Sequence, residues 1–172
     1  AMAFVNASGA GWTRWTVQWF NVQREPDEFN DFYFTNEKGE NILDIQLKSG
    51  MKVAAMVLGT PEWAAETPGL KPGTSVPRGL YEPVFLGDEP NPDNLWGAFM
   101  FRLAKEFIGK MDVFEIWNEV EIPANGPNAI YNTWAGTPAD YYQLLAVASR
   151  AAKKANPNAR IVTSPYSYFK DK

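Results

Sequence analysis

The sequence contains neither cysteine nor histidine among its 172 residues. Without cysteine there are no disulfide bonds and no thiol nucleophile, and without histidine there is neither imidazole catalysis nor the commonest metal ligand. Any acid–base chemistry must therefore depend on carboxyl groups, which the 20 Asp and Glu residues supply. We accordingly expect a site that uses no metal ion and no cofactor.

An excess of positive charge and a long apolar run are also missing. The formal net charge is −4, so the composition argues against nucleic acid or an anionic membrane as the partner. No apolar run of about 18 residues occurs, which argues against a transmembrane helix. The N-terminus lacks the basic and apolar regions of a signal peptide, although processing can remove one. Secretion and a cytoplasmic location both remain open.

Strands and helices are predicted to alternate along the chain, in a single domain that spans residues 1–172. The predicted strands are continuous apolar runs, which are typical of a parallel sheet buried on both faces. Apolar residues at spacings of three and four indicate the helices between them. Predicted strands lie at 12–20 and 52–58, in the run that ends before Asn118, and at 160–163; predicted helices lie at 41–49, 93–108 and 137–155.

A long segment rich in proline and glycine follows the second predicted strand, at about 62–92. Loops of more than about 15 residues without regular structure are uncommon in compact domains, and they are usually functional or disordered. A loop that follows a parallel strand also lies at the edge of the sheet where ligands bind in α/β proteins. A part in the site and a mobile insertion both remain open for this segment.

The most informative stretch is Phe-Glu-Ile-Trp-Asn-Glu at 114–119, which places Asn118 and Glu119 where a buried strand opens into a loop. A partly desolvated glutamate resists ionisation, so it can stay protonated near neutral pH and act as a general acid. The alternative is a glutamate that forms a structural ion pair with a lysine or an arginine. The stretch alone does not decide between the two.

The segment Glu-Ile-Trp-Asn-Glu at 115–119 resembles the fourth-strand motif of clan A glycoside hydrolases, the retaining (β/α)8-barrel β-glycosidases. This resemblance implies that Glu119 is the acid/base residue and that Asn118 holds a sugar hydroxyl. Residues 9–19 are similar to the second barrel strand, whose arginine supports the catalytic carboxylates. That similarity implies the supporting role for Arg14.

The resemblance continues along the chain in the same order. Residues 53–64 are similar to the third strand and its Thr-Pro-x-Trp-Ala loop, and residues 141–164 are similar to the fourth helix and the fifth strand. The implied fold is α/β: about half of a (β/α)8 TIM barrel, with four parallel strands, strands two to five, and flanking helices. A complete barrel has about 250 residues, or about 200 at the lower limit, so 172 residues are too few to close one.

Arg14 lies in the middle of its predicted strand. A guanidinium group that points into a barrel has to be paired, because an uncompensated buried charge is very unfavourable. Glu115 and Glu119 are an even number of positions apart, so on an extended strand they share a face. We expect Glu115 to be the structural partner of a basic residue rather than a catalytic group.

Four tryptophans lie at or just beyond predicted strand ends: Trp19, Trp63, Trp117 and Trp134. An indole ring offers a flat apolar face and one N–H donor, which suits the apolar C–H face and the surrounding hydroxyls of a sugar. We expect these side chains to bind the carbohydrate. Packing between the sheet and the helices is the alternative, above all for Trp19 and Trp117.

Retaining hydrolysis needs two carboxyl groups, and in this family the nucleophile is a glutamate on the seventh strand, which has no counterpart in this chain. The sequence therefore predicts a glycoside hydrolase for β-linked oligo- or polysaccharides, with Glu119 as general acid/base; without a nucleophile, the chain alone is expected to be inactive. One alternative is an inactive half-barrel that binds carbohydrate or self-associates through its exposed sheet edges. A metal-dependent hydrolase built on Glu115, Glu119 and Glu121 has less support, because histidine is absent.

Overall fold

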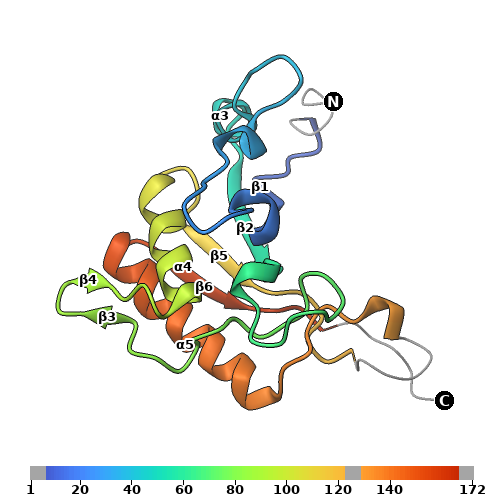
Figure 1. The fold of residues 1–172 in the computed structure, drawn as a ribbon. Helices are drawn as coiled ribbons and strands as arrows, with labels where there is room; N and C mark the ends of the chain where they lie inside the picture. The colour runs from blue at the N-terminus through green and yellow to red at the C-terminus, as the bar shows by residue number, and fades with distance from the viewer. Residues whose placement is uncertain (1–6, 123–128, 167–172) are drawn as a thin grey trace.

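The computed structural model describes residues 7–122 and 129–166, and its centre is a sheet of four parallel strands (Figure 1). The strands of this sheet are β1 (Trp12–Gln18), β2 (Lys52–Leu58), β5 (Val113–Ile116) and β6 (Arg160–Thr163). Their order across the sheet follows the chain, and each neighbouring pair is parallel. This is the arrangement of consecutive strand–helix units in a (β/α)8 barrel, so the predicted half-barrel is confirmed.

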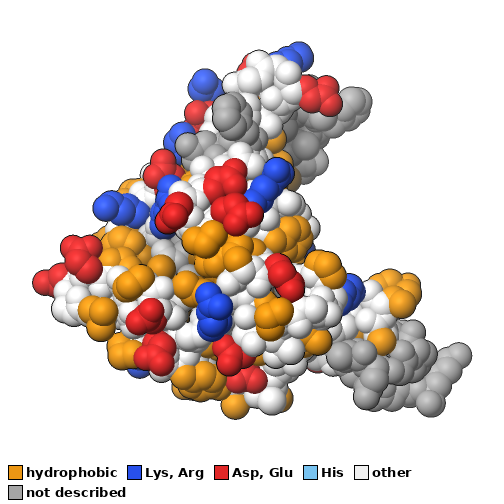
Figure 2. All heavy atoms as spheres, viewed as in Figure 1, with side chains coloured by type: hydrophobic (Ala, Val, Ile, Leu, Met, Phe, Trp, Pro, Cys, Tyr) orange, Lys and Arg blue, Asp and Glu red, His pale blue; other side chains and the backbone are white. Residues whose placement is uncertain are grey.

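Helices and short turns form the connections between the strands. The α-helices are α2 (Trp19–Val22), α3 (Ile42–Lys48), α4 (Leu95–Glu106) and α5 (Pro138–Ala155). The loops contain the 3-10 turns η1 (Asp31–Phe34), η2 (Glu62–Ala64) and η3 (Ala129–Tyr131), and the hairpin of β3 (Phe85–Leu86) and β4 (Glu89–Pro90). α4 and α5 pack against each other (Figure 1), and the surface around them mixes acidic, basic and apolar side chains (Figure 2).

The observed limits of α3, α4 and α5 agree with the predicted helix limits within two residues, because the residues that begin and end a helix act locally. α5 begins with a capping box: the Thr137 hydroxyl accepts a hydrogen bond from the Asp140 N–H, and the Asp140 carboxylate accepts one from the Thr137 N–H. Pro138 occupies the first turn, where its missing N–H costs nothing. α3 begins at the Asn41 cap and is followed by Gly50, whose φ of 79° is readily adopted by glycine.

The two faces of the sheet differ in their environment. The face toward the helices carries apolar side chains that are fully buried, among them Val17, Val57 and Phe114. The opposite face, which would surround the axis of a closed barrel, leaves Arg14 and Lys52 exposed. Successive side chains of a strand point to opposite faces, which explains this alternation. The prediction of burial on both faces is therefore wrong: in the described part of the chain, the inner face of the half-barrel is open.

The long segment after β2 is an ordered loop that folds back on itself. The Thr60 hydroxyl donates a hydrogen bond to the Ser75 carbonyl at 2.6 Å, and the Arg78 N–H donates to the Ala64 carbonyl at 2.8 Å. These bonds join the start of the loop to its middle. The segment is therefore a folded loop at the carboxyl edge of the sheet, and its part in the site stays a prediction.

Candidate active site

Asn118 and Glu119 lie directly beyond the carboxyl end of β5, which ends at Ile116. The carboxyl ends of parallel strands meet at one edge of the sheet, and in barrel enzymes that edge carries the catalytic groups. Arg14 lies on β1, and its side chain extends across β2 toward β5 on the open face. The structure thus brings together the three residues that the sequence predicts to be catalytic.

These three residues and Glu115 form one chain of hydrogen bonds. Arg14 Nε and Nη2 donate to the two carboxylate oxygens of Glu115, at 2.8 and 2.7 Å. The same Nη2 donates to Asn118 Oδ1 at 3.0 Å, and Asn118 Nδ2 donates to Glu119 Oε2 at 3.1 Å. Because a guanidinium has donors only, it holds the oxygen of the Asn118 amide toward itself and turns the NH2 group toward Glu119.

The positive charge of Arg14 is held between two carboxylates. Its hydrogen bond to Glu115 raises the pKa of Arg14; burial opposes this effect, and the negative charges of Glu115 and Glu119 add to it. The Arg14 side chain is 46% exposed, whereas that of Glu115 is 13% exposed. Both Glu115 oxygens are bound by the guanidinium in the bidentate geometry that favours strong ion pairs. The expectation that Glu115 is a structural partner is therefore confirmed.

The backbone on both sides of Asn118 is strained. Trp117 has a φ of 69° and Glu119 a φ of 48°, and among the described residues no other non-glycine residue has a positive φ. The left-handed region costs an L-residue about 1–2 kcal/mol, and strain of this kind clusters at functional sites. Neighbouring strand ends hold the turn: the Trp117 N–H donates to the Val57 carbonyl at 2.8 Å, and the Glu119 N–H donates to the Pro165 carbonyl at 3.2 Å.

The predicted sugar-binding tryptophans are mostly enclosed. Trp19 and Trp117 are fully buried, and Trp134 is 3% exposed. The Trp19 ring stacks on Phe99 with the ring centroids 4.9 Å apart, and the Trp117 ring packs edge-on against Trp134 at 4.8 Å. Rings enclosed in this way have no free face for a sugar, so the packing alternative is the one that fits Trp19 and Trp117.

Trp63 keeps part of its surface exposed, but it lies away from Glu119. Its indole N–H donates to the Gln23 carbonyl at 3.2 Å, and its ring packs edge-on against Trp19 at 5.9 Å. It lines a hollow of about 310 Å³ that includes Arg102 and no residue of the Asn118 turn. Sugar binding by Trp63 therefore stays a prediction.

A hollow of about 360 Å³ opens beside the candidate site, between α5 and the end of β6. Its wall includes Trp134 and Glu121, the second residue after Glu119. Tyr142 and Tyr166 also line it, and both of these rings are strongly exposed. The sequence does not point to these two tyrosines, because the exposure of an aromatic ring on a predicted helix or at a strand end is set by packing that the local pattern does not show.

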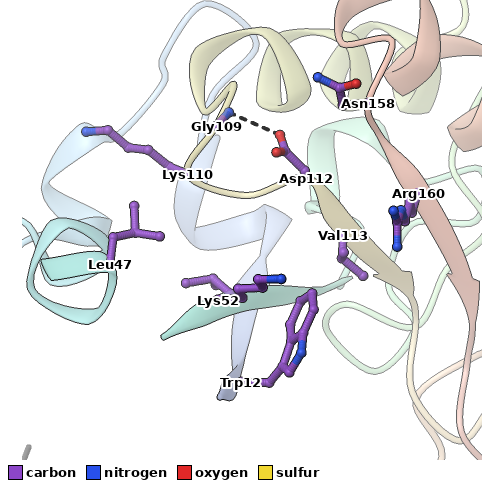
Figure 3. Close-up of a pocket in the computed structure, with 10 residues that line it drawn as sticks. Trp12, Leu47, Lys52, Gly109, Lys110, Asp112, Val113, Asn158 and Arg160 are labelled. Atoms are coloured by element: carbon purple, nitrogen blue, oxygen red, sulfur yellow. Dashed lines mark hydrogen bonds between the residues drawn. The ribbon is translucent and has the colours of Figure 1, made fainter. Parts of the chain in front are cut away.

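A hollow of about 410 Å³ lies at the opposite, amino-terminal edge of the sheet (Figure 3). There the Lys52 amine lies over the Trp12 ring, 5.4 Å from its centroid, and Asp112 accepts a hydrogen bond from the Gly109 N–H at 3.0 Å. None of the predicted site residues lines this hollow. In barrel proteins this edge serves stability rather than catalysis, so the candidate active site is the carboxyl edge.

Within residues 7–122 and 129–166, no group of three or more Asp, Glu, His or Cys side chains is positioned to hold a metal ion. Glu115, Glu119 and Glu121 do not form such a group, and the Glu115 oxygens bind Arg14 instead. No helix in these same ranges is long and apolar enough to cross a bilayer.

No protein-family model matches the chain, and no curated protein matches its sequence. Solved structures match its fold: a family 39 glycoside hydrolase from Bacteroides cellulosilyticus WH2 (TM-score 0.62, 18% identity), a glucosidase from Croceicoccus marinus (0.61, 10%) and the endoglucanase Cel5A from Thermotoga maritima (0.57, 14%). The matches cover 94%, 96% and 97% of this chain, but 27%, 33% and 44% of those proteins. At these identities the likeness establishes the fold: the chain is about half of a (β/α)8 TIM barrel of the kind found in glycoside hydrolases.

Proposed function

We propose that the chain forms the acid/base half of a retaining β-glycosidase site, with Glu119 as the general acid/base. The observation that carries this proposal is the chain of hydrogen bonds from Arg14 through Asn118 to Glu119, at the carboxyl edge of a half-barrel. Arg14 supports the carboxylates, and Asn118 orients Glu119 and offers a contact to the sugar. The glycosidase fold of the solved structures supports the same function from independent evidence.

In a retaining mechanism, one carboxylic acid protonates the departing glycosidic oxygen and afterwards takes a proton from water. Asn118 Nδ2 binds Oε2 of Glu119, so we place the transferable proton on Oε1. That proton passes to the leaving oxygen as the bond from this oxygen to the anomeric carbon breaks. The same carboxylate oxygen later removes a proton from the attacking water, and the charge of Arg14 stabilises the carboxylate between the two steps.

The second carboxylate of such a site attacks the anomeric carbon and lies about 5–5.5 Å from the first. Glu115 is not suited to this role, because both of its oxygens bind Arg14. We nominate no nucleophile among the described residues. A complete site therefore needs a carboxylate from a further part of the polypeptide or from another chain, and we expect no turnover by these 172 residues alone.

The proposed substrate class is a β-linked oligosaccharide or polysaccharide. Thermotoga maritima Cel5A, whose fold matches at 15% and 14% identity, has crystal structures in complex with cellobiose and with mannotriose. In this chain the hollow beside Trp134 presents the exposed rings of Tyr142 and Tyr166. Flat aromatic surfaces of this kind can carry further sugar rings next to Glu119.

The test combines binding with hydrolysis. The chain and its Glu119→Gln variant are titrated with cellobiose and longer β-linked oligosaccharides while the side-chain amide resonances of Asn118 are followed by NMR, and both are incubated with activated aryl β-glycosides. Shifts of the Asn118 resonances without turnover support the half-site, and turnover that Glu119→Gln abolishes supports a complete one. Glu106→Gln, at the exposed end of α4, is the matched control. The absence of both binding and turnover contradicts the proposal.

The second candidate is a half-barrel without activity that binds carbohydrate or self-associates, and the observation that favours it is the edge of β6. In the described part of the chain, β6 pairs with β5 and has no strand on its other side. The β1 edge is less accessible, because the Tyr33 hydroxyl donates to the Thr16 carbonyl at 2.8 Å and accepts from the Gln18 N–H at 3.3 Å.

Sedimentation equilibrium tests this second candidate. An oligomer that Val162→Lys converts to a monomer supports pairing through β6, since a charged edge opposes strand addition. A monomer at every concentration contradicts self-association.

A further inference from the structure

Residues 130–134, here called the clamp segment, are hydrogen-bonded to the strained turn through Thr133. The Thr133 hydroxyl donates to the Asn118 carbonyl. In the reverse direction, the Trp117 indole Nε1 donates to the Thr133 carbonyl at 2.7 Å. One residue therefore binds the turn twice, once at its backbone and once at an adjoining side chain.

The buried side chain of Asn132 fixes the shape of the clamp segment. Asn132 Nδ2 donates to the Ile122 carbonyl at 2.6 Å and to the Trp134 carbonyl at 2.7 Å. Both amide hydrogens are thus used, one toward the chain after Glu119 and one within the segment. Because Thr133 lies between Asn132 and Trp134, these two bonds determine where its hydroxyl points.

The long loop after β2 holds the clamp segment through Lys71. Lys71 Nζ donates to the carbonyls of Ile130 and Asn132, at 2.7 and 2.8 Å. Close to this contact, the Thr74 carbonyl accepts a hydrogen bond from the Ala135 N–H at 2.8 Å. Lys71 takes part in none of the ion pairs formed among the described residues. Its ammonium group, which has donors only, is therefore directed at the backbone carbonyls of the clamp segment.

We propose that Thr133 and Lys71 are positioning residues for Glu119. The Asn118 carbonyl belongs to the peptide unit that joins Asn118 to Glu119, so fixing its direction also fixes the φ of Glu119, which is 48°. Without the Thr133 hydroxyl, this peptide unit keeps only the hydrogen bond from the Glu119 N–H to the Pro165 carbonyl, at 3.2 Å, so it rotates more easily and can release the left-handed strain. The Glu119 carboxyl group then moves away from Asn118 Nδ2. Lys71 acts one step further back, because it holds the carbonyl of Asn132 that immediately precedes Thr133.

This inference rests on the proposed function for its consequence in catalysis, but the positioning itself is measurable without turnover. The readouts are the backbone N–H of Glu119 and the side-chain NH2 of Asn118 in proton–nitrogen NMR spectra. Thr133→Val removes the hydroxyl and keeps the branched shape, whereas Thr133→Ser keeps the hydroxyl. Lys71→Met removes the ammonium group, and Lys153→Met, on an exposed part of α5, is its matched control.

We expect Thr133→Val and Lys71→Met to shift both sets of resonances, while Thr133→Ser and Lys153→Met leave them at the wild-type positions. Thermal unfolding of each variant shows whether it is folded. If Thr133→Val does not fold, the resonances of Lys71→Met decide whether the clamp segment positions Glu119. Unchanged Glu119 and Asn118 resonances in folded Thr133→Val or Lys71→Met overturn the proposal. Equal shifts in Thr133→Val and Thr133→Ser overturn it as well, because they show that shape rather than the hydroxyl matters.

The dissociation constant for a β-linked oligosaccharide is measured on the same proteins. If the wild-type chain binds, we expect Thr133→Val to bind about fivefold more weakly, the equivalent of one hydrogen bond, and Thr133→Ser to bind as the wild type does. If the wild-type chain does not bind, the proposed function loses its support, while the NMR comparison still decides whether Thr133 and Lys71 position Glu119.

Discussion

Arg14 binds both carboxylate oxygens of Glu115, at 2.8 and 2.7 Å, although the two residues are 101 positions apart in the sequence. Arg14 belongs to β1 and Glu115 to β5, so the pair reaches across β2, the strand between them. It therefore links β1 to β5 on the open face of the sheet. The same guanidinium orients the Asn118 amide, so the pair connects the stability of the half-barrel with the geometry of the candidate site.

Removal of Arg14 is expected to destabilise the fold. Arg14→Met leaves the largely covered Glu115 carboxylate without its donors, which should lower the free energy of unfolding by about 1–3 kcal/mol. Arg14→Lys restores a charge but not the two-pronged geometry, so we expect it to recover only part of the loss. Urea unfolding measures the free energy of unfolding of both variants, with a substitution at an exposed arginine, Arg150→Met, as control. Equal midpoints for Arg14→Met and Arg150→Met would show that the pair contributes nothing.

The start of α5 should make stability depend on acid pH. Burial raises the pKa of Asp140, but the hydrogen bonds from Thr137 and from the Tyr81 hydroxyl outweigh it, so the pKa is lowered. A carboxylate whose pKa is lower in the folded state contributes stability that is fully present above its ordinary pKa of about 3.9. That contribution is lost as the pH falls through the lower folded-state value.

Asp140→Asn tests this dependence. At pH 6 we expect its Tm to lie about 2–4 °C below that of the wild type, the effect of about 1 kcal/mol of capping in a chain of this size. The difference should narrow as the pH falls below 4, because the wild-type carboxylate then becomes protonated. A Tm difference that stays constant from pH 6 to pH 3 would exclude the charge of Asp140 as its cause.

The elements of the fold were predictable because their signals are local. The apolar run of β2 and the Thr137–Pro138 start of α5 are contiguous in sequence, and their physical causes act within a turn or a strand. The first strand was predicted two residues too long, because Trp19 belongs to an apolar run but begins α2. There Trp19 stacks on Phe99 of α4, a contact that the local sequence does not contain.

The candidate site was predictable only in part. Glu119, Asn118 and Arg14 were nominated from a motif, and the structure places them in one hydrogen-bonded chain; their catalytic roles stay predictions. Thr133 was missed because a threonine in a loop carries no signal of its own, and its role comes from a contact with Asn118, in the turn after β5 and 15 positions earlier. The burial of Trp117 was left open for the same reason: enclosure depends on residues that are distant in sequence.

Gly79 should be the least replaceable glycine of the long loop. Its φ is 70°, and a Cβ added there would lie 1.8 Å from the Asp93 carbonyl oxygen, a backbone atom directly before the Asn94 cap of α4. Gly87 has a similar φ of 63°, but a Cβ there meets nothing within 4 Å. It therefore serves as a matched control for the backbone strain alone.

We expect Gly87→Ala to cost about 1 kcal/mol of unfolding free energy and Gly79→Ala about 3 kcal/mol, because the second variant must also displace the start of α4. Urea unfolding of the two variants gives the comparison. Equal losses of unfolding free energy in the two variants would mean that the close approach to Asp93 is relieved without a further loss of stability.

The Tyr141 hydroxyl joins the ends of two strands next to the candidate site. It donates to the Ile116 carbonyl at 2.9 Å and accepts from the Ser164 N–H at 2.6 Å, and burial raises the pKa of Tyr141. Tyr141→Phe leaves a buried carbonyl and a buried N–H without partners, so we expect a loss of about 1–3 kcal/mol in urea unfolding. Tyr142→Phe, one position along the same helix and 74% exposed, should change stability by less than about 0.5 kcal/mol. Hydrogen exchange of the Ser164 amide separates local from global effects. Faster exchange in Tyr141→Phe but not in Tyr142→Phe places the loss of stability at the ends of β5 and β6. Equal exchange in both variants would mean that water or another group replaces the hydroxyl.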